Sequence, residues 1–166
     1  MATTYSVIQS QTLGSTSTII SFANIPSIYT DLRLIFTAVP LNGTGISTYL
    51  QFNNDGNYNY SSTWMYSNGS SVGKNRQLNT NTLYTNINYT SGGSSFTQSI
   101  DFMSYANTSI YKTILIRDGG APAGSGLSTG MWRNTAAITN IDVVRGTSNN
   151  SFQPGSVFTL YGIASA

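Results

Sequence analysis

The stretch Asp31-Leu32-Arg33-Leu34-Ile35-Phe36-Thr37-Ala38-Val39 decides the fold class, because it is the longest β-favouring run among the 166 residues. The run is preceded by Pro26 and closed by Pro40, two residues that punctuate regular structure. In a strand, every second side chain points to the same face. One face of this run then carries only apolar side chains, which are Leu32, Leu34, Phe36 and Ala38. The pattern predicts a central strand.

Outward from this run, the chain reads as short apolar or alternating segments separated by turn residues, and no helix is indicated. Further strands are expected at Tyr5 to Gln11, Thr18 to Phe22, Ser47 to Phe52, Tyr60 to Tyr66, Thr82 to Tyr89, Ser95 to Met103, Tyr111 to Arg117, Gly126 to Trp132, Ile138 to Val144 and Ser156 to Ile163. Many of them place Asn or Thr on one face, as antiparallel sheets with one wet side do. We therefore expect an all-β, antiparallel β-sandwich, jelly-roll-like, with about ten strands.

No internal repeat and no linker divides the sequence, which predicts one β-sandwich domain over residues 1–166. Gly69 to Asn81 and Gly119 to Gly126 are predicted to be loops that leave the scaffold. The closing run, Ser156 to Ile163, is expected to pair within its own sheet rather than to be donated to a neighbouring molecule. Gly162 would allow another group to pack closely there.

The composition excludes most enzyme chemistry, because the chain has no His, Cys or Glu and only five Asp. General acid-base work draws on His or tuned carboxyls, and zinc chemistry draws on Cys and His. A glycosidase would need two carboxyls about 5 to 10 Å apart. Instead, Arg residues stand near three of the Asp residues and predict local charge compensation: Asp31 near Arg33, Asp118 beside Arg117, and Asp142 close to Arg145. The expectation is a protein that is not an enzyme and has no cofactor.

Charge and hydropathy also limit the partners. The net charge is only +2, and Lys74 with Arg76 is the densest basic pair, so no basic stripe for nucleic acid is visible. No stretch approaches the roughly 18 apolar residues of a membrane span, and Met1 to Gln11 does not read as a signal peptide. We expect neither nucleic-acid nor membrane binding. The absence of Cys leaves the redox compartment open.

One segment has the alternating oxygen ligands of a calcium loop, at Asn53, Asp55, Asn57 and Asn59. A true loop of that kind has its Gly at the sixth position and a Glu at the twelfth, and the Gly56 and Trp64 of this chain do not fit. Asp55-Gly56 instead predicts a hairpin turn, and no metal site is expected.

Aromatic residues gather before and within the Tyr60 to Tyr66 run and supply the candidate contact residues, which are Tyr58, Tyr60, Trp64, Tyr66 and, further along the chain, Trp132. The first four share one face by parity. If that face is exposed, rings among Asn and Ser suit the stacking of sugars. If it is buried, the rings belong to the core or to an oligomer seam, which is the favoured interpretation.

Several segments together resemble a family of uncharacterised structural proteins of tailed-phage virions. The segments are Tyr5-Ser6-Val7-Ile8-Gln9-Ser10-Gln11-Thr12-Leu13-Gly14, Ile25-Pro26-Ser27-Ile28-Tyr29-Thr30-Asp31-Leu32, Phe52-Asn53-Asn54-Asp55-Gly56-Asn57-Tyr58, Tyr105-Ala106-Asn107-Thr108, Trp132-Arg133-Asn134-Thr135-Ala136-Ala137-Ile138-Thr139 and Phe152-Gln153-Pro154-Gly155-Ser156-Val157-Phe158-Thr159-Leu160-Tyr161-Gly162-Ile163. They span nearly the whole chain in order, and they are strand and turn segments rather than catalytic motifs.

The resemblance implies a non-enzymatic virion protein made in the host cytoplasm, most simply a capsid decoration, cement or head-fibre protein. Its expected partners are the major capsid protein or tail proteins, and a homo-oligomer, favoured as a trimer, is expected because virion knobs are closed assemblies. The alternative is a tail or fibre module that recognises a host surface carbohydrate through Trp64 and the neighbouring tyrosines. Fold alone does not separate these two functions.

Overall fold

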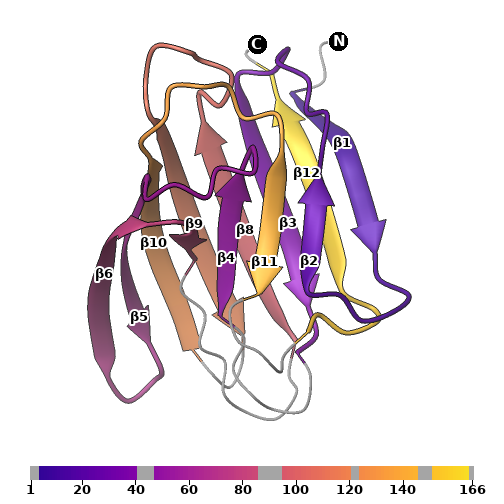
Figure 1. Ribbon diagram of the computed structural model, residues 1–166. Coiled ribbons are helices and arrows are strands. Elements are labelled where there is room, and N and C mark those ends of the chain that lie inside the picture. The colour runs from indigo at the N-terminus through magenta and orange to yellow at the C-terminus, as the bar shows by residue number, and fades with distance from the viewer. Residues whose placement is uncertain (1–3, 41–46, 86–94, 121–123, 146–150, 165–166) are drawn as a thin grey trace.

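The computed structural model describes residues 4–40, 47–85, 95–120, 124–145 and 151–164, and these residues form twelve strands in two antiparallel sheets without a helix (Figure 1). The larger sheet has, in spatial order, β1 (Tyr5–Thr12), β12 (Val157–Ile163), β3 (Asp31–Ala38), β8 (Phe96–Met103), β9 (Lys112–Gly120), β10 (Gly124–Trp132), β5 (Tyr60–Ser67) and β6 (Val72–Thr80). The smaller sheet has β2 (Ile19–Phe22), β11 (Ile141–Arg145), β4 (Thr48–Phe52) and β7 (Leu83–Tyr84). The predicted all-β sandwich is confirmed, with somewhat more strands than expected.

The alternation in β3 determines how the two sheets meet. Leu32, Leu34 and Phe36 are buried, whereas Ile35 and Thr37 on the other face of the strand are exposed. β3 pairs with β12 on one side and β8 on the other, so the prediction of a central strand is confirmed. Burying one face of each sheet against the other is what stabilises a sandwich.

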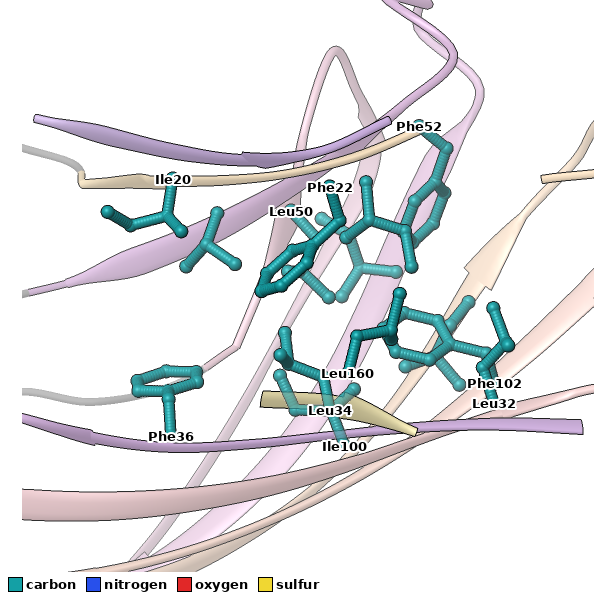
Figure 2. Close-up of a cluster of buried hydrophobic side chains, with 14 of the residues drawn as sticks. Ile20, Phe22, Leu32, Leu34, Phe36, Leu50, Phe52, Ile100, Phe102 and Leu160 are labelled. Atoms are coloured by element: carbon teal, nitrogen blue, oxygen red, sulfur yellow. The ribbon is translucent and has the colours of Figure 1, made fainter. Parts of the chain in front are cut away.

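The core lies between the two sheets (Figure 2). Figure 2 shows Ile20, Phe22 and Leu50 of the smaller sheet facing Leu34 and Ile100 of the larger one. All five of these side chains are at most 3% exposed. Burial of this kind contributes about 25 cal/mol for each Å² of apolar surface removed from water, and it is the main stabilising contribution here.

Strand β12 shows why the chain needs a glycine near its end. β12 lies between β1 and β3, so the described closing strand belongs to its own sheet, as predicted. Phe158, Leu160 and Gly162 face inward and are fully or almost fully buried. A Cβ atom at residue 162 would overlap the Tyr29 ring, which confirms the close approach expected there.

Two predicted loops are wrong. Residues 72–80, expected within a polar loop, form strand β6, whose side chains are exposed or half-buried on both faces and so show no apolar alternation. Gly119 and Gly120 end β9, and Gly124 begins β10, so most of the second predicted loop is a hairpin. Residues 121–123 of that loop lie outside the described residues.

Other strand boundaries shift by a few residues. The expected strand from Ile138 begins only at Ile141, because residues 133–140 form a connection held by hydrogen bonds. The run expected from Thr82 contains the two-residue β7, and its part from 86 to 89 lies outside the described residues. In the part of the chain that the structure describes, no helix is long and apolar enough to cross a membrane.

Candidate functional site

Four of the segments that resemble phage virion proteins meet at one end of the sandwich, the upper end in Figure 1. The connections there are residues 23–30, 53–59, 104–111 and 133–140, which we call the motif end. The Ile25 N–H donates to the Thr139 carbonyl at 3.0 Å, and the Ile138 N–H donates to the Tyr105 carbonyl at 2.9 Å. The Tyr105 hydroxyl in turn donates to the Pro26 carbonyl.

The Asp55 carboxylate accepts hydrogen bonds from several residues of the motif end. Its Oδ2 accepts hydrogen bonds from the Trp132 indole N–H at 2.8 Å and from the Asn59 amide at 3.0 Å. Its Oδ1 accepts from both the backbone N–H and the side-chain amide of Asn57, at 3.0 and 2.7 Å. The Asn134 amide approaches Oδ2 at 3.4 Å. One carboxylate thereby joins the connection after β4 to the connection after β10.

The ionisation of Asp55 follows from these donors. Burial opposes the charged form, but the hydrogen bonds from Asn59, Asn57 and Trp132 outweigh it and hold the pKa of Asp55 well below its ordinary value. The donors occupy both carboxylate oxygens with N–H groups, and the Asn57 and Asn59 amides turn their nitrogens, not their oxygens, toward the carboxylate. The alternating Asn and Asp residues therefore form a hydrogen-bonded network around the Asp55 carboxylate rather than a set of oxygen ligands for a metal ion. Among the described residues, no three His, Cys, Asp or Glu side chains gather to hold a metal.

The predicted Asp55-Gly56 hairpin is wrong, because the segment links strands of different sheets, β4 and β5. The tight turn lies two residues earlier. The Asp55 N–H donates to the Phe52 carbonyl at 2.8 Å across Asn53 and Asn54, which have φ values of 52° and 55°. Asn tolerates this left-handed conformation better than other residues with a side chain do.

Lys112 also links connections of the motif end by hydrogen bonds. The side chain is fully buried, and its ammonium donates to the carbonyls of Asn107, Ile110 and Thr135 at 2.5, 2.9 and 3.0 Å. Burial lowers the pKa of Lys112, and the three carbonyls offset part of that cost. Nothing in the sequence indicated this role, since a lysine at the start of a strand is ordinarily at the surface.

Three of the five aromatic candidates are core residues and cannot contact a ligand or a partner. Tyr60 and Trp132 are fully buried and stack on each other with ring centroids 6.3 Å apart, and Phe52 packs against both. Trp64 is 7% exposed and packs edge-on against Tyr84 of β7 at 4.6 Å. The smaller sheet covers this part of the face, and the interpretation as core holds for these three residues.

The other two candidates remain accessible. Tyr58, predicted by parity to share one face with Tyr60, Trp64 and Tyr66, lies instead in the connection before β5 and is 70% exposed. Tyr66, near the end of β5, is 44% exposed. The Tyr66 ring lies over Gly73 of β6, where any Cβ atom would overlap it. Further along the same face of β6 come the exposed Asn75, two residues from Gly73, and the half-buried Gln77, four residues from it. The structure thus places one accessible aromatic ring on the same face of the sheet as two amides.

The charge pairs expected from neighbours in sequence are wrong. Arg33 and Arg117 both bind Asp101, the latter at 3.0 Å, across three adjacent strands. Arg117 points away from Asp118 because consecutive strand residues face opposite sides of the sheet. Asp31 accepts instead from the Ser104 N–H at 2.6 Å.

Asp142, expected to be compensated by Arg145, accepts a hydrogen bond from the Asn140 amide at 3.0 Å. Asp142 and Arg145 are three residues apart on β11, and an odd spacing along a strand places two side chains on opposite faces. Sequence proximity was therefore a poor guide to charge pairing in these strands.

The solvent side of the larger sheet, which we call the outer face, is broad and mixes apolar, hydroxyl and charged side chains. Its exposed apolar side chains are Tyr5, Val7, Ile35, Met65, Val72, Leu78, Met103, Leu127, Met131 and Val157. Ser and Thr fill many of the positions between them, and Leu127 lies directly opposite Met65. The outer face therefore presents apolar side chains interspersed with hydroxyl groups.

No family model matches the chain, and no curated protein matches it. Solved structures with a similar fold include the CBM40 of Ruminococcus gnavus IT-sialidase bound to alpha2,3 sialyllactose, at 9% identity and a TM-score of 0.43, covering 96% of this chain and 95% of that one. The marine PL-14 alginate lyase from Aplysia kurodai matches at 9% identity and a TM-score of 0.36, covering 95% and 88%. Domains LG4-5 of the mouse laminin alpha1 chain match at 14% identity and a TM-score of 0.37, covering 92% and 40%. Likeness of this degree carries no information about activity or ligand.

Proposed function

We propose that this chain is a non-enzymatic structural protein of a tailed-phage particle, a capsid decoration or head-fibre protein that contacts other virion proteins, foremost the major capsid protein. The observation that carries the proposal is the motif end. The segments that resemble virion proteins hydrogen-bond to one another there, through Asp55, Lys112 and Tyr105, so that they serve the scaffold. A scaffold of this kind is what a family of structural proteins would have in common.

The carboxylates support the non-enzymatic part of the proposal. Asp31, Asp55, Asp101 and Asp142 each accept hydrogen bonds from nitrogen donors of the protein. A general acid or base needs a carboxyl that faces substrate, and hydrolysis of sugars needs two of them. These four are instead engaged in holding connections and strands together.

The outer face supports a role in contacts between proteins. It combines exposed apolar groups with hydroxyls, and its central charges, Arg33, Asp101 and Arg117, neutralise one another in part. Interfaces are enriched in exposed Met and aromatic side chains and in Arg, and this face has all three. We propose that this face is used for contact within the particle, including contact between copies in a homo-oligomer.

Immunogold labelling of purified virions with an antibody against this chain tests the proposal. The expected result is gold on the head, with none on particles treated with pre-immune antibody. Gold confined to the tail or fibres would replace decoration by an attachment role. No labelling of intact particles, combined with absence of the chain from their protein profile, would contradict a virion function altogether.

Carbohydrate binding is a second candidate, favoured by the placement of Tyr66 on the same face of the sheet as Asn75 and Gln77. Sugars stack on aromatic rings and take hydrogen bonds from amides, and here both are accessible on one face. Trp64, which the sequence suggested as the principal contact, is buried and would only support the position of this site.

Replacing Tyr66 by alanine is expected to weaken binding of purified host surface polysaccharide about tenfold, as loss of one stacking ring does. Isothermal titration measures the affinity, and an unchanged near-ultraviolet circular dichroism spectrum shows that the fold is intact. Tyr58→Ala, which removes an exposed tyrosine elsewhere, is the matched control and should bind like the unaltered protein. Equal affinity of the Tyr66→Ala variant and the unaltered protein would exclude this site.

A further inference from the structure

Strand β6 is an open edge of the larger sheet. It pairs with β5 on one side, and no described strand pairs with its other side (Figure 1). The opposite edge strand, β1, is treated differently. Its Gln9 and Gln11 amides donate to the Ala23 and Ser21 carbonyls, each at 2.7 Å, and tie that edge to the end of β2. Within the described residues, the β1 edge is therefore hydrogen-bonded to the smaller sheet, whereas β6 has no strand along its outer side.

The backbone of β6 is available for pairing. The Arg76 N–H donates to the side chain of its neighbour Asn75 at 2.8 Å, a local bond that an incoming strand could replace. N–H groups along a strand alternate between its two sides, so the Lys74 and Leu78 N–H groups lie on the same side as that of Arg76. β6 has nine residues, which is long for an exposed edge. Natural sheets usually shorten, cover or charge such edges, and β6 has only the charges of Lys74 and Arg76.

The charge of β6 narrows the choice of partner. Lys74 and Arg76 both project from the outer face, opposite Met65 and Thr63 of β5. Neither cation makes an ion pair with a residue that the structure describes. Two positive charges, two residues apart on one side of a free strand, complement an extended segment that carries acidic residues at the same spacing.

A second copy of the chain is a poor occupant of this edge. In an antiparallel pair of β6 strands centred on Asn75, Lys74 would face Arg76 of the other copy, and Arg76 would face its Lys74. Centring the pair on Lys74 or on Arg76 places two identical cations opposite each other. Like charges directly opposite destabilise a strand pair, so β6 opposes self-pairing in each of these central registers.

We propose that β6 is a docking edge to which a partner protein adds an extended strand with acidic residues at alternate positions. The added strand would hydrogen-bond to the free backbone of β6, and its acidic side chains would lie beside Lys74 and Arg76. The proposal does not depend on the particle in which the chain works, because it uses only the edge, its backbone and its charge.

The test uses the full chain and a fluorescein-labelled peptide, Thr-Val-Glu-Val-Glu-Val-Thr, followed by fluorescence anisotropy. The acidic peptide is expected to bind about tenfold more tightly than the same peptide with Gln in place of Glu, since two exposed ion pairs contribute about this much. N-methylation of one alternate set of peptide amides should abolish binding, whereas N-methylation of the other set should not, because only one set faces β6.

Variants of β6 locate the binding. The double variant Lys74→Gln/Arg76→Gln should lose the preference for the acidic peptide, and Lys74→Glu/Arg76→Glu should prefer a peptide with Lys in place of Glu. The matched control, Val7→Glu/Thr12→Glu, changes the net charge by the same two units as the Gln variant, on exposed positions of β1 at the other edge. The control should retain the preference for the acidic peptide.

Two outcomes would overturn the proposal. One is an acidic peptide that binds the Gln variant as tightly as the unaltered chain, which would place the contact elsewhere. The other is that no peptide shows saturable binding, up to millimolar concentration, to the unaltered chain or to its variants, when all of them have the same thermal stability. Reversal of preference in the Glu variant would support the proposal, because loss of folding cannot create a new specificity.

Discussion

Replacing Trp132 by alanine is expected to lower the free energy of unfolding by about 4 kcal/mol, the usual size for truncating a buried Trp. Trp132 is fully buried, stacks on Tyr60 and packs against Phe52, so the truncation leaves a large cavity between the sheets. It also removes the indole N–H from the Asp55 carboxylate. Domains are stable by about 5–15 kcal/mol, so the variant would lose a large share of its stability.

Chemical denaturation, followed by circular dichroism, measures this change. In thermal denaturation the same loss corresponds to a fall in Tm of roughly 8–16 °C for a chain of this length. Trp132→Phe is the control, because it retains most of the ring volume but removes the donor to Asp55. We expect a smaller loss for Trp132→Phe, about 1–3 kcal/mol. Equal stability of the alanine variant and the unaltered chain would show that this packing is not required.

Replacing Lys112 by alanine is expected to cost about 3–5 kcal/mol. The substitution removes a fully buried side chain and leaves the carbonyls of Asn107, Ile110 and Thr135 without their shared donor. These carbonyls belong to two connections of the motif end: Asn107 and Ile110 lie in residues 104–111, and Thr135 lies in residues 133–140. Their loss of a donor would loosen this end while leaving the strand ladders in place.

Lys112→Met separates the two contributions to this cost. Methionine fills nearly the same volume but donates no hydrogen bond, so the difference between the two variants measures packing and the residual loss in Lys112→Met measures the ammonium. Urea denaturation gives both free energies, and hydrogen exchange of the Ile138 amide, which bonds to Tyr105, reports on the motif end. A loss below about 1 kcal/mol in both variants would contradict a structural role for the ammonium, given the usual cost of orphaned buried acceptors.

Strands buried on one face could be predicted from the sequence because their side chains alternate. β3 and β12 were predicted in position, and the apolar face predicted for β3, with Leu32, Leu34, Phe36 and Ala38, is the buried one. β6 could not be predicted this way, since both of its faces are exposed or half-buried and its sequence carries no alternation. What makes β6 a strand is pairing with β5, a contact between residues that no local pattern records.

The candidate site was predicted only in part. Parity correctly placed Tyr60, Trp64 and Tyr66 on one face of β5, but it could not show where the smaller sheet stops covering that face. The smaller sheet covers Tyr60 and Trp64, which are buried, but it does not reach Tyr66, which remains accessible. The role of Lys112 was equally hidden, because its three acceptors come from backbone carbonyls, which have no signature in the sequence.

Taken by itself, the amino-acid sequence determined the all-β class, the central strand β3 with its apolar face, and the close approach at Gly162. These follow from local periodicity and from the size of single side chains. Only the tertiary structure decided which charges pair, as with Arg33, Arg117 and Asp101, and that Asp55 meets Trp132. Such contacts join residues far apart in the chain, so their partners are set by the order of strands in the sheets rather than by any neighbouring residue.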